Sequence, residues 1–189
     1  MELLVAGENV DPELLAEVSV LGHPPRVLGV FRRADLPRRP TPEVGLALWR
    51  VADPGNVGTL VRTADALGPA FVALSAGSAD PTGPKAMRAS MGALFRVPVL
   101  PFDEAPGRRI ALVAHGGVAP AELDLSGPTT FVLGAERGGL TDEVLASCEE
   151  RMTIPLAGAA ESLNVATAGA IALYERARRA NQTVSSRPA

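Results

Sequence analysis

Short apolar runs bounded by turn residues alternate along this chain with stretches in which apolar residues recur at helical spacing. The runs are nearly continuous, which is typical of strands covered on both faces. The predicted strands cover residues 27–31, 45–49, 70–74, 97–100, 110–114, 130–133 and 151–154. The predicted helices cover residues 12–18, 56–67, 84–94, 142–147 and 163–180. Strands that alternate with helices predict an α/β fold with a mainly parallel sheet.

Two predicted helices begin at clear capping sequences. Asp53-Pro54-Gly55-Asn56 is a turn that can cap the helix after it, and Thr141 precedes the acidic pair Asp142-Glu143. The last predicted helix carries small residues instead of bulky ones in its first half, so another backbone could approach it closely. These residues are Ala166, Ala168, Gly169, Ala170 and Ala172.

Prolines separate the first part of the chain from the rest. The stretch 34–42 is rich in proline and arginine and is typical of a linker. We therefore expect a small N-terminal unit with its linker at residues 1–40, a main domain at residues 41–181, and a disordered tail at residues 182–189.

Composition narrows the cellular compartment and the kinds of partner expected for the protein. The single cysteine, Cys148, excludes an internal disulfide and fits a reducing compartment. The sequence shows no signal peptide and no apolar run long enough to span a bilayer, so we expect a cytoplasmic protein with no membrane partner. His23 and His115 lie far apart and away from Cys148, so no metal site is expected.

Charge does not point to a nucleic-acid binder at first sight. The formal net charge is −3, whereas phosphate contacts need cationic side chains. The distribution is more informative than the sum, because five arginines crowd residues 26–39 and only Asp35 offsets them. The cluster is either a solvated surface loop or a phosphate-binding patch.

Three stretches rich in glycine and small polar residues carry the functional signal. They are Asp53-Pro-Gly-Asn-Val-Gly-Thr-Leu-Val-Arg62, Phe131-Val-Leu-Gly-Ala-Glu-Arg-Gly-Gly-Leu140, and Ile154-Pro155 followed by Glu161-Ser-Leu-Asn-Val165. Their order, spacing and residue types resemble the three signature motifs of the SpoU (TrmH-like) RNA ribose methyltransferases, over about Val44 to Ala177. A dinucleotide site is excluded, because the glycines at 134, 138 and 139 lack the required spacing.

The resemblance implies a cofactor, a fold and an assembly. The cofactor is S-adenosylmethionine, and the implied binding residues are Leu133, Gly134, Gly139, Leu140, Ile154, Pro155 and Leu163. The fold implied is a parallel-sheet domain with a C-terminal deep trefoil knot, preceded by a short, truncated or reduced N-terminal RNA-binding unit. The assembly implied is a homodimer whose active sites form across the interface, with the last helix in that interface.

The same resemblance implies a set of catalytic residues, namely Arg62, Asn56, Glu136, Ser162 and Asn164. Arg62 is placed at the ribose. Since a guanidinium has a pKa above 12, orienting the 2′-hydroxyl and a phosphate is physically easier for it than acting as a base. Without the family, Arg62 would be interpreted as an ordinary surface arginine paired with Asp65 or with a glutamate elsewhere. Plain helix capping is the corresponding reading of Asn56, Ser162 and Asn164.

The sequence therefore predicts an enzyme that methylates a ribose 2′-hydroxyl of structured RNA, ribosomal or transfer. The predicted RNA contacts are Arg26, Arg32, Arg33, Lys85 and Arg88. Two alternatives stay open. One is a catalytically silent knotted protein that binds RNA or assists assembly. The other is a methyltransferase whose acceptor is a small molecule or a base nitrogen instead of a ribose. The arginine cluster around Arg32 should matter for an RNA acceptor and be irrelevant for a small uncharged one.

Overall fold

The computed structural model describes residues 2–19, 23–37 and 43–185, and the chain divides into two compact units, residues 1–36 and 37–189. The expected domain boundary at residue 40 lies outside the described residues, as does the part of the expected tail beyond residue 185. Within the described residues, no helix is both long and apolar enough to pass through a membrane.

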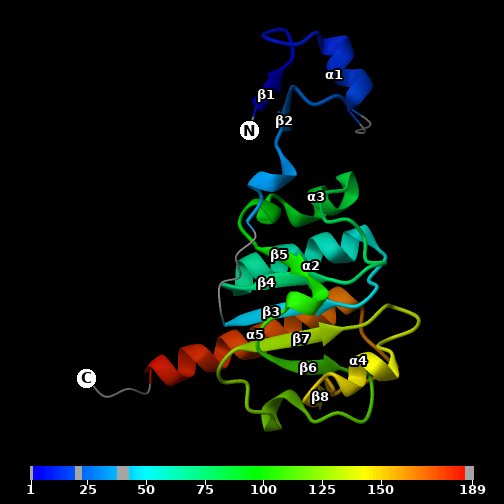
Figure 1. The fold of residues 1–189 in the computed structure, drawn as a ribbon, viewed down its shortest axis with the longest axis vertical. Helices are drawn as coiled ribbons and strands as arrows, with labels where there is room; N and C mark the ends of the chain where they lie inside the picture. Colours follow the sequence, from blue (N-terminus) through cyan, green and yellow to red (C-terminus); the bar gives the residue numbers. More distant parts are fainter. Residues whose placement is uncertain (1, 20–22, 38–42, 186–189) are drawn as a thin grey trace. The chain divides into compact units, whose positions relative to one another are not determined.

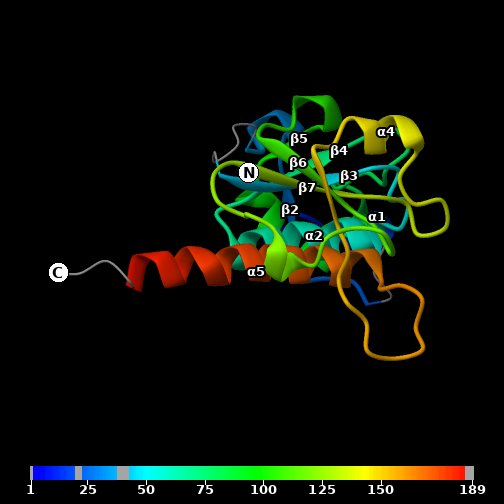
Figure 2. The same cartoon turned by 90° about the horizontal axis from the view of Figure 1, so that it is seen from below.

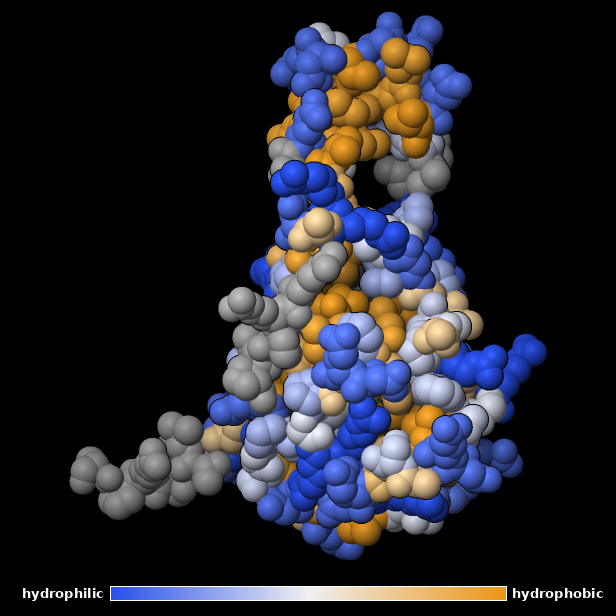
Figure 3. Space-filling view, viewed as in Figure 1, coloured by the Kyte–Doolittle hydropathy of each residue, from blue (hydrophilic) through white to orange (hydrophobic). Residues whose placement is uncertain are grey.

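The N-terminal unit is a two-stranded antiparallel sheet with one helix. Strand β1 (Glu2–Val5) pairs with β2 (Val27–Val30), and α1 (Pro12–Val18) lies between them in the chain. Asp11 caps α1 by accepting the N–H of Glu13 at 2.8 Å. Sequence analysis found β2 and α1 but missed β1. Apolar side chains at 3, 14, 18, 27 and 30 are exposed, and Figure 3 shows such side chains gathered on this unit.

The second unit is built on a six-stranded sheet in which every pairing is parallel (Figure 1). The strand order is β5-β4-β3-β7-β6-β8. The strands are β3 (Val44–Leu48), β4 (Phe71–Leu74), β5 (Val99–Pro101), β6 (Arg108–Leu112), β7 (Thr129–Leu133) and β8 (Glu150–Met152). The predicted α/β fold with a mainly parallel sheet is therefore confirmed.

Helices cover the sheet on both faces. Figure 2 shows α2 (Pro54–Leu67) and α5 (Val165–Ser185) on one face and α4 (Asp142–Ala146) on the other. Helix α3 (Pro84–Ser90) packs on α2. Every residue of β3 and of β7 is buried, which explains why both sequences read as continuous apolar runs. The loops that lead to α2, α4 and α5 all begin at the carboxyl ends of strands, and this end of the sheet is the one that matters for function.

Two helix boundaries differ from the prediction. The helix predicted at 84–94 ends at Ser90, because Met91 and Gly92 adopt positive φ angles of 50° and 81°; a separate short turn follows at Ala93–Phe95. The last helix runs to Ser185 instead of ending at residue 180, so residues 182–185 of the expected tail are helical.

An acid-sensitive cluster ties α5 to the rest of its unit. Glu175 accepts hydrogen bonds from Arg178 at 2.7 Å and from Arg179 at 2.9 Å, and Arg179 also donates to the carbonyl of Leu123 at 2.6 Å. The hydrogen bond from Arg178, followed by the one from Arg179, lowers the pKa of Glu175 from 4.5 to about 2 against the opposing effect of burial.

We expect Glu175→Gln to remove a contribution to stability that depends on pH. Because the folded pKa lies below 4.5, the contribution is complete above that value and is lost as pH falls from 4.5 towards about 2. The wild type should exceed the variant by roughly 1–3 kcal/mol at pH 7 and by almost nothing near pH 2. Urea unfolding at pH 7, 4 and 3 measures this difference. Glu104→Gln, at an exposed glutamate, is the control and should show no such trend; a pH-independent gap for Glu175→Gln would contradict the prediction.

Candidate active site

The site begins at the turn between β3 and α2. Asp53 caps α2 by accepting the N–H of Asn56 at 2.9 Å, and its other carboxylate oxygen accepts from Lys85 at 2.9 Å. These two hydrogen bonds, that from Lys85 being the larger effect, lower the pKa of Asp53. The turn thus holds the first residues of α2 in place and presents the Asn56 amide away from the cap.

A chain of hydrogen bonds joins the three sequence motifs. Asn56 donates through Nδ2 to Glu136 Oε1 at 2.7 Å, and Asn164 Nδ2 donates to Asn56 Oδ1 at 3.2 Å. The Asn164 Oδ1 also caps α5, because it accepts the N–H groups of Ala166 at 2.8 Å and of Thr167 at 3.3 Å. The amide of Asn56 is therefore fixed at both ends, and Glu136 is held by an amide instead of by a positive charge.

Beside this chain lies a cavity of about 440 Å³, at the carboxyl ends of β6, β7 and β8. Five of the seven residues predicted to bind the cofactor line it, namely Leu133, Gly134, Gly139, Ile154 and Leu163. Glu136, Ser162 and Asn164 line it as well. Its size and mixed lining are those of a small-molecule site, and ligands of open parallel sheets bind at this edge.

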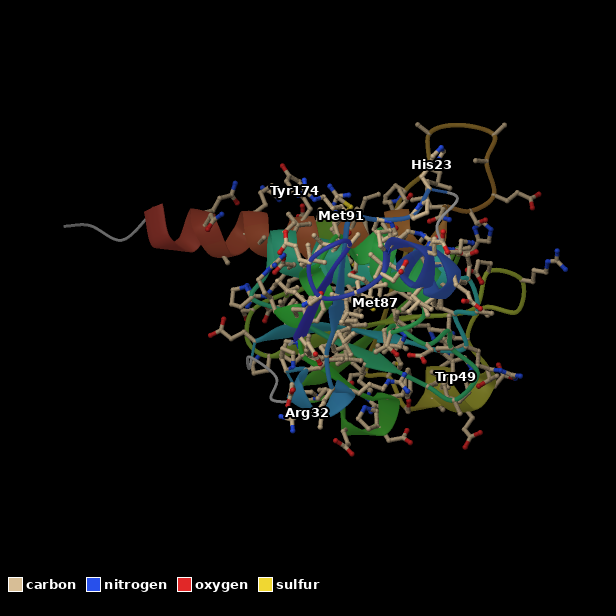
Figure 4. All side chains as sticks on the ribbon, turned by 90° about the horizontal axis from the view of Figure 1, so that it is seen from above. His23, Arg32, Trp49, Met87, Met91 and Tyr174 are labelled. Carbon is tan, nitrogen blue, oxygen red and sulfur yellow. The ribbon has the colours of Figure 1, made fainter. Side chains whose placement is uncertain are left out.

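Two predicted cofactor residues are not among those that line the cavity. Leu140 packs against an apolar cluster together with Trp49 and Cys148, and Pro155 stands between the lining residues Ile154 and Leu156. Trp49 lies beside α4 in Figure 4 and packs against Phe102, with ring centres 5.1 Å apart and ring planes inclined at 60°. Burial raises the pKa of the Cys148 thiol.

Sequence analysis missed several lining residues. Leu112, Val113 and Ala114 come from the end of β6, and Met152 comes from β8. Both strands were predicted, so the rule that ligands meet the carboxyl ends of parallel strands would have pointed to these residues. They belong to no glycine-rich motif, which is why a search for motifs alone passes over them.

Arg62 does not join the network. It is exposed on α2, and the structure records no side-chain hydrogen bond or ion pair for it with any other described residue. Asp65 instead pairs with Arg96 at 2.6 Å, and this bond lowers the pKa of Asp65. Arg62 is therefore a surface arginine, as the alternative reading expected, but its expected pairing with Asp65 is wrong.

The predicted RNA contacts differ in their surroundings. Lys85 is engaged by Asp53, whereas Arg88 is exposed on α3. In the N-terminal unit Arg32 forms a two-bond pair with Asp35, at 3.1 Å for each bond, and Arg26 and Arg33 are exposed. Among the residues that the structure describes, no group of three or more His, Cys, Asp or Glu side chains is arranged to hold a metal ion.

The fold and this cavity define an α/β protein with a cofactor site at the carboxyl edge of a parallel sheet. The profile of the SpoU rRNA methylase family matches residues 43–174, and the chain belongs to that family. It is 35% identical to the 23S rRNA (uridine(2479)-2′-O)-methyltransferase of Streptomyces viridochromogenes, over 94% of this chain and 68% of the relative. It is 40% identical to the 23S rRNA (guanosine(2553)-2′-O)-methyltransferase RlmP of Bacillus subtilis, over 68% of this chain and 56% of the relative.

Solved structures agree with the family. The AdoMet-bound rRNA methyltransferase from Sinorhizobium meliloti superposes with a TM-score of 0.79 at 32% identity, covering 88% of this chain and 69% of that one. The AviRb SpoU methyltransferase of Streptomyces viridochromogenes in complex with AdoMet gives 0.73 at 30% identity, covering 93% and 73%. The resemblance read from the motifs, the class of enzyme and S-adenosylmethionine as its cofactor are thereby confirmed.

Proposed function

We propose that this protein transfers a methyl group from S-adenosylmethionine to a ribose 2′-hydroxyl of RNA, with ribosomal RNA as the first substrate to test. The observation that carries the proposal is the bonded chain Glu136–Asn56–Asn164 at the side of the cavity. It brings polar groups from all three motifs to one place. Two relatives that act on 23S rRNA ribose support the choice of acceptor.

The residues of the cavity suit the cofactor. Leu133, Ile154 and Leu163 offer aliphatic surface to a flat adenine ring, and Gly134 lines the cavity beside them. When bound, S-adenosylmethionine supplies a methyl group on a positively charged sulfur. The protein's part is to hold the acceptor oxygen in line with that methyl group and to stabilise the charge that develops on the oxygen.

We infer that Arg62 performs this task in a neighbouring copy of the chain. Six residues separate Arg62 from Asn56, which places it about 9 Å further along α2 and roughly 120° around the helix axis. A side chain in that direction faces away from the amide chain of its own subunit. Its exposure and lack of a described partner are consistent with an arginine that meets its ligand across an interface.

A homodimer is accordingly part of the proposal. Tyr174 on α5 is 57% exposed and points outward (Figure 4), and Leu156 is 37% exposed. The segment between β8 and α5, drawn in orange, projects from its unit (Figure 2), although Ile154, Ser162 and Leu163 of this segment line the cavity. A second copy packed against α5 and this segment would cover these surfaces and close the site.

We also infer the trefoil knot. Thr153, which follows β8, is bonded on both sides by one segment: its N–H donates to the carbonyl of Val118 at 3.0 Å, and its hydroxyl donates to that of Val113 at 3.1 Å. The hydroxyl also accepts the N–H of Gly117 at 2.9 Å. Residues 113–118 thus flank the chain at Thr153, which supports a segment that passes through a loop there.

The N-terminal unit and the cellular location complete the proposal. The exposed Arg26 and Arg33 support an RNA-binding role for the N-terminal unit. A cytoplasmic location accords with the single cysteine and with ribosomal RNA as substrate.

Transfer of a radiolabelled methyl group from S-adenosylmethionine to unmodified RNA tests the function. Ribosomal and transfer RNA are assayed separately, and the label is located after nuclease digestion. We expect label on ribose in the ribosomal fraction. Label on a base would support the non-ribose alternative, and tight cofactor binding with no transfer to either RNA would favour the silent RNA-binding protein.

A further inference from the structure

Arg50 occupies a backbone conformation that arginine rarely adopts. It lies in the turn after β3, and its φ angle is 54°, in the left-handed region. Glycine or asparagine would take this conformation with less strain. An arginine at such a position suggests that its side chain has a use, because strained residues persist where function requires them.

The turn itself does not depend on the arginine side chain. The loop after β4 braces the turn through the N–H of Arg50, which donates to Ser75 Oγ at 2.8 Å. Ser78 Oγ donates to the carbonyl of Leu48 at 3.1 Å, and the N–H of Ala79 donates to the carbonyl of Val51 at 2.9 Å. These bonds involve only the main chain of residues 48–51, so any residue that tolerates a positive φ angle would preserve the turn.

The Arg50 side chain passes beside Gly77, and no described residue neutralises its guanidinium. Its side chain runs along Gly77, with Nε 3.6 Å and Cγ 3.7 Å from the point that a Cβ on Gly77 would occupy. The residue is exposed, and the structure records no hydrogen bond or ion pair for its side chain with any described residue. Asp53, three residues later, is already engaged by Lys85.

Arg50 lies at the same end of the parallel strands as the cavity. It follows β3 at the carboxyl edge of the sheet, toward which the arrowheads of β3 and β7 both point in Figure 1. Asn56 begins α2 from the same turn and bonds to Glu136 on the neighbouring loop. Arg137, next to Glu136, is a second exposed arginine with no partner among the described residues.

We propose that Arg50 binds a backbone phosphate of the RNA substrate and so positions the strand beside Asn56 and Glu136. The inference rests on the proposed function, to which it adds a substrate-positioning residue outside the three motifs. A guanidinium suits this task because its planar donors match phosphate oxygens in pairs. Arg50 touches the strand and not the reacting atoms, so it should govern RNA affinity and leave the methyl-transfer step alone.

Arg50→Gly and Arg50→Asn test this role without disturbing the turn. Both should keep or raise the melting temperature, leave S-adenosylmethionine affinity unchanged and retain kcat at saturating RNA. We expect the KM for RNA to rise about tenfold, the usual scale for loss of a charged hydrogen-bonded contact. The slope of log affinity against log salt should fall in magnitude by about 0.7–0.9, as for one lost phosphate contact. Arg50→Lys should lie between the wild type and these variants.

Arg151→Ala is the matched control, because it removes an exposed arginine from β8 at the opposite edge of the sheet from β5. It should leave both the KM and the salt slope at wild-type values. Equal RNA affinity and equal salt slope for Arg50→Gly and the wild type would overturn the proposal.

Direct binding separates this inference from the proposed function. The probe is an unmodified 23S rRNA transcript, measured by filter retention with S-adenosylhomocysteine present. If the wild type binds the transcript but transfers no methyl group, the proposed reaction fails, and the comparison of Arg50→Gly with the wild type still decides the role of Arg50. If the wild type shows no salt-dependent binding, the role of Arg50 in RNA binding is overturned as well.

Discussion

Methyl transfer should fall by roughly 10²–10³-fold or more when Arg62 is replaced by Ala, the scale seen when a group that stabilises a developing oxyanion is removed. The fold should persist, because Arg62 is exposed on α2 and its side chain bonds to no described residue. Cofactor affinity should also persist, since Arg62 does not line the cavity. Single-turnover methylation of unmodified ribosomal RNA, with calorimetric titration of S-adenosylmethionine, measures both quantities. Turnover at the wild-type rate would exclude a catalytic role for Arg62.

Mixing two inactive variants tests whether Arg62 acts across an interface. Arg62→Ala is unfolded and refolded together with Gly134→Ala, a variant expected to lose the cofactor site. If each site combines Arg62 of one copy with the cavity of the other, random pairing restores about a quarter of the wild-type sites. If Arg62 serves the cavity of its own subunit, the mixed dimer contains no intact site and the activity stays at the level of the separate variants.

The sequence predicted the sheet better than it predicted the helix ends. Every strand of the parallel sheet lies within two residues of its predicted position, because burial on both faces leaves an apolar run that is easy to see. Strand β1 was not predicted. It is short, its apolar residue Leu3 is exposed, and it belongs to a unit too small to bury much surface. The helical spacing of apolar residues at 84–94 continues past the end of α3. The left-handed conformation of Met91 ends the helix, and a hydrophobic pattern does not reveal that conformation.

The residues of the candidate site were likewise predicted only in part. Family motifs brought together Asn56, Glu136 and Asn164, which the structure joins by hydrogen bonds. They could not show that Leu140 faces the apolar cluster instead of the cavity, because one residue of a tight loop can point to either side. Arg50 lay outside every motif, and what singles it out is a backbone angle that arginine adopts rarely and that no residue pattern encodes.

Gly134→Ala should abolish cofactor binding, with a loss of affinity on the order of 100-fold or more if the loop opens by even one atom's width. A Cβ on Gly134 would lie 2.3 Å from the carbonyl carbon of Gly139 and 2.6 Å from the N–H nitrogen of Leu140. These are main-chain atoms that a rotamer change cannot move, so the two sides of the 134–139 loop must separate. Both Gly134 and Gly139 line the cavity, and its shape would change with them. Calorimetric titration with S-adenosylmethionine measures the effect.

Gly138→Ala is the matched control, because it adds the same methyl group to the same loop where nothing lies within 4 Å. Gly138 also has an ordinary φ angle, so alanine fits there without backbone strain. We expect this variant to bind S-adenosylmethionine as the wild type does. Equal loss in both variants would mean that general loop flexibility governs binding; no loss in either would place the cofactor outside this cavity. A loss confined to Gly134→Ala would mean that cofactor binding depends on the close contact between Gly134 and Gly139, which keeps the two sides of the loop together.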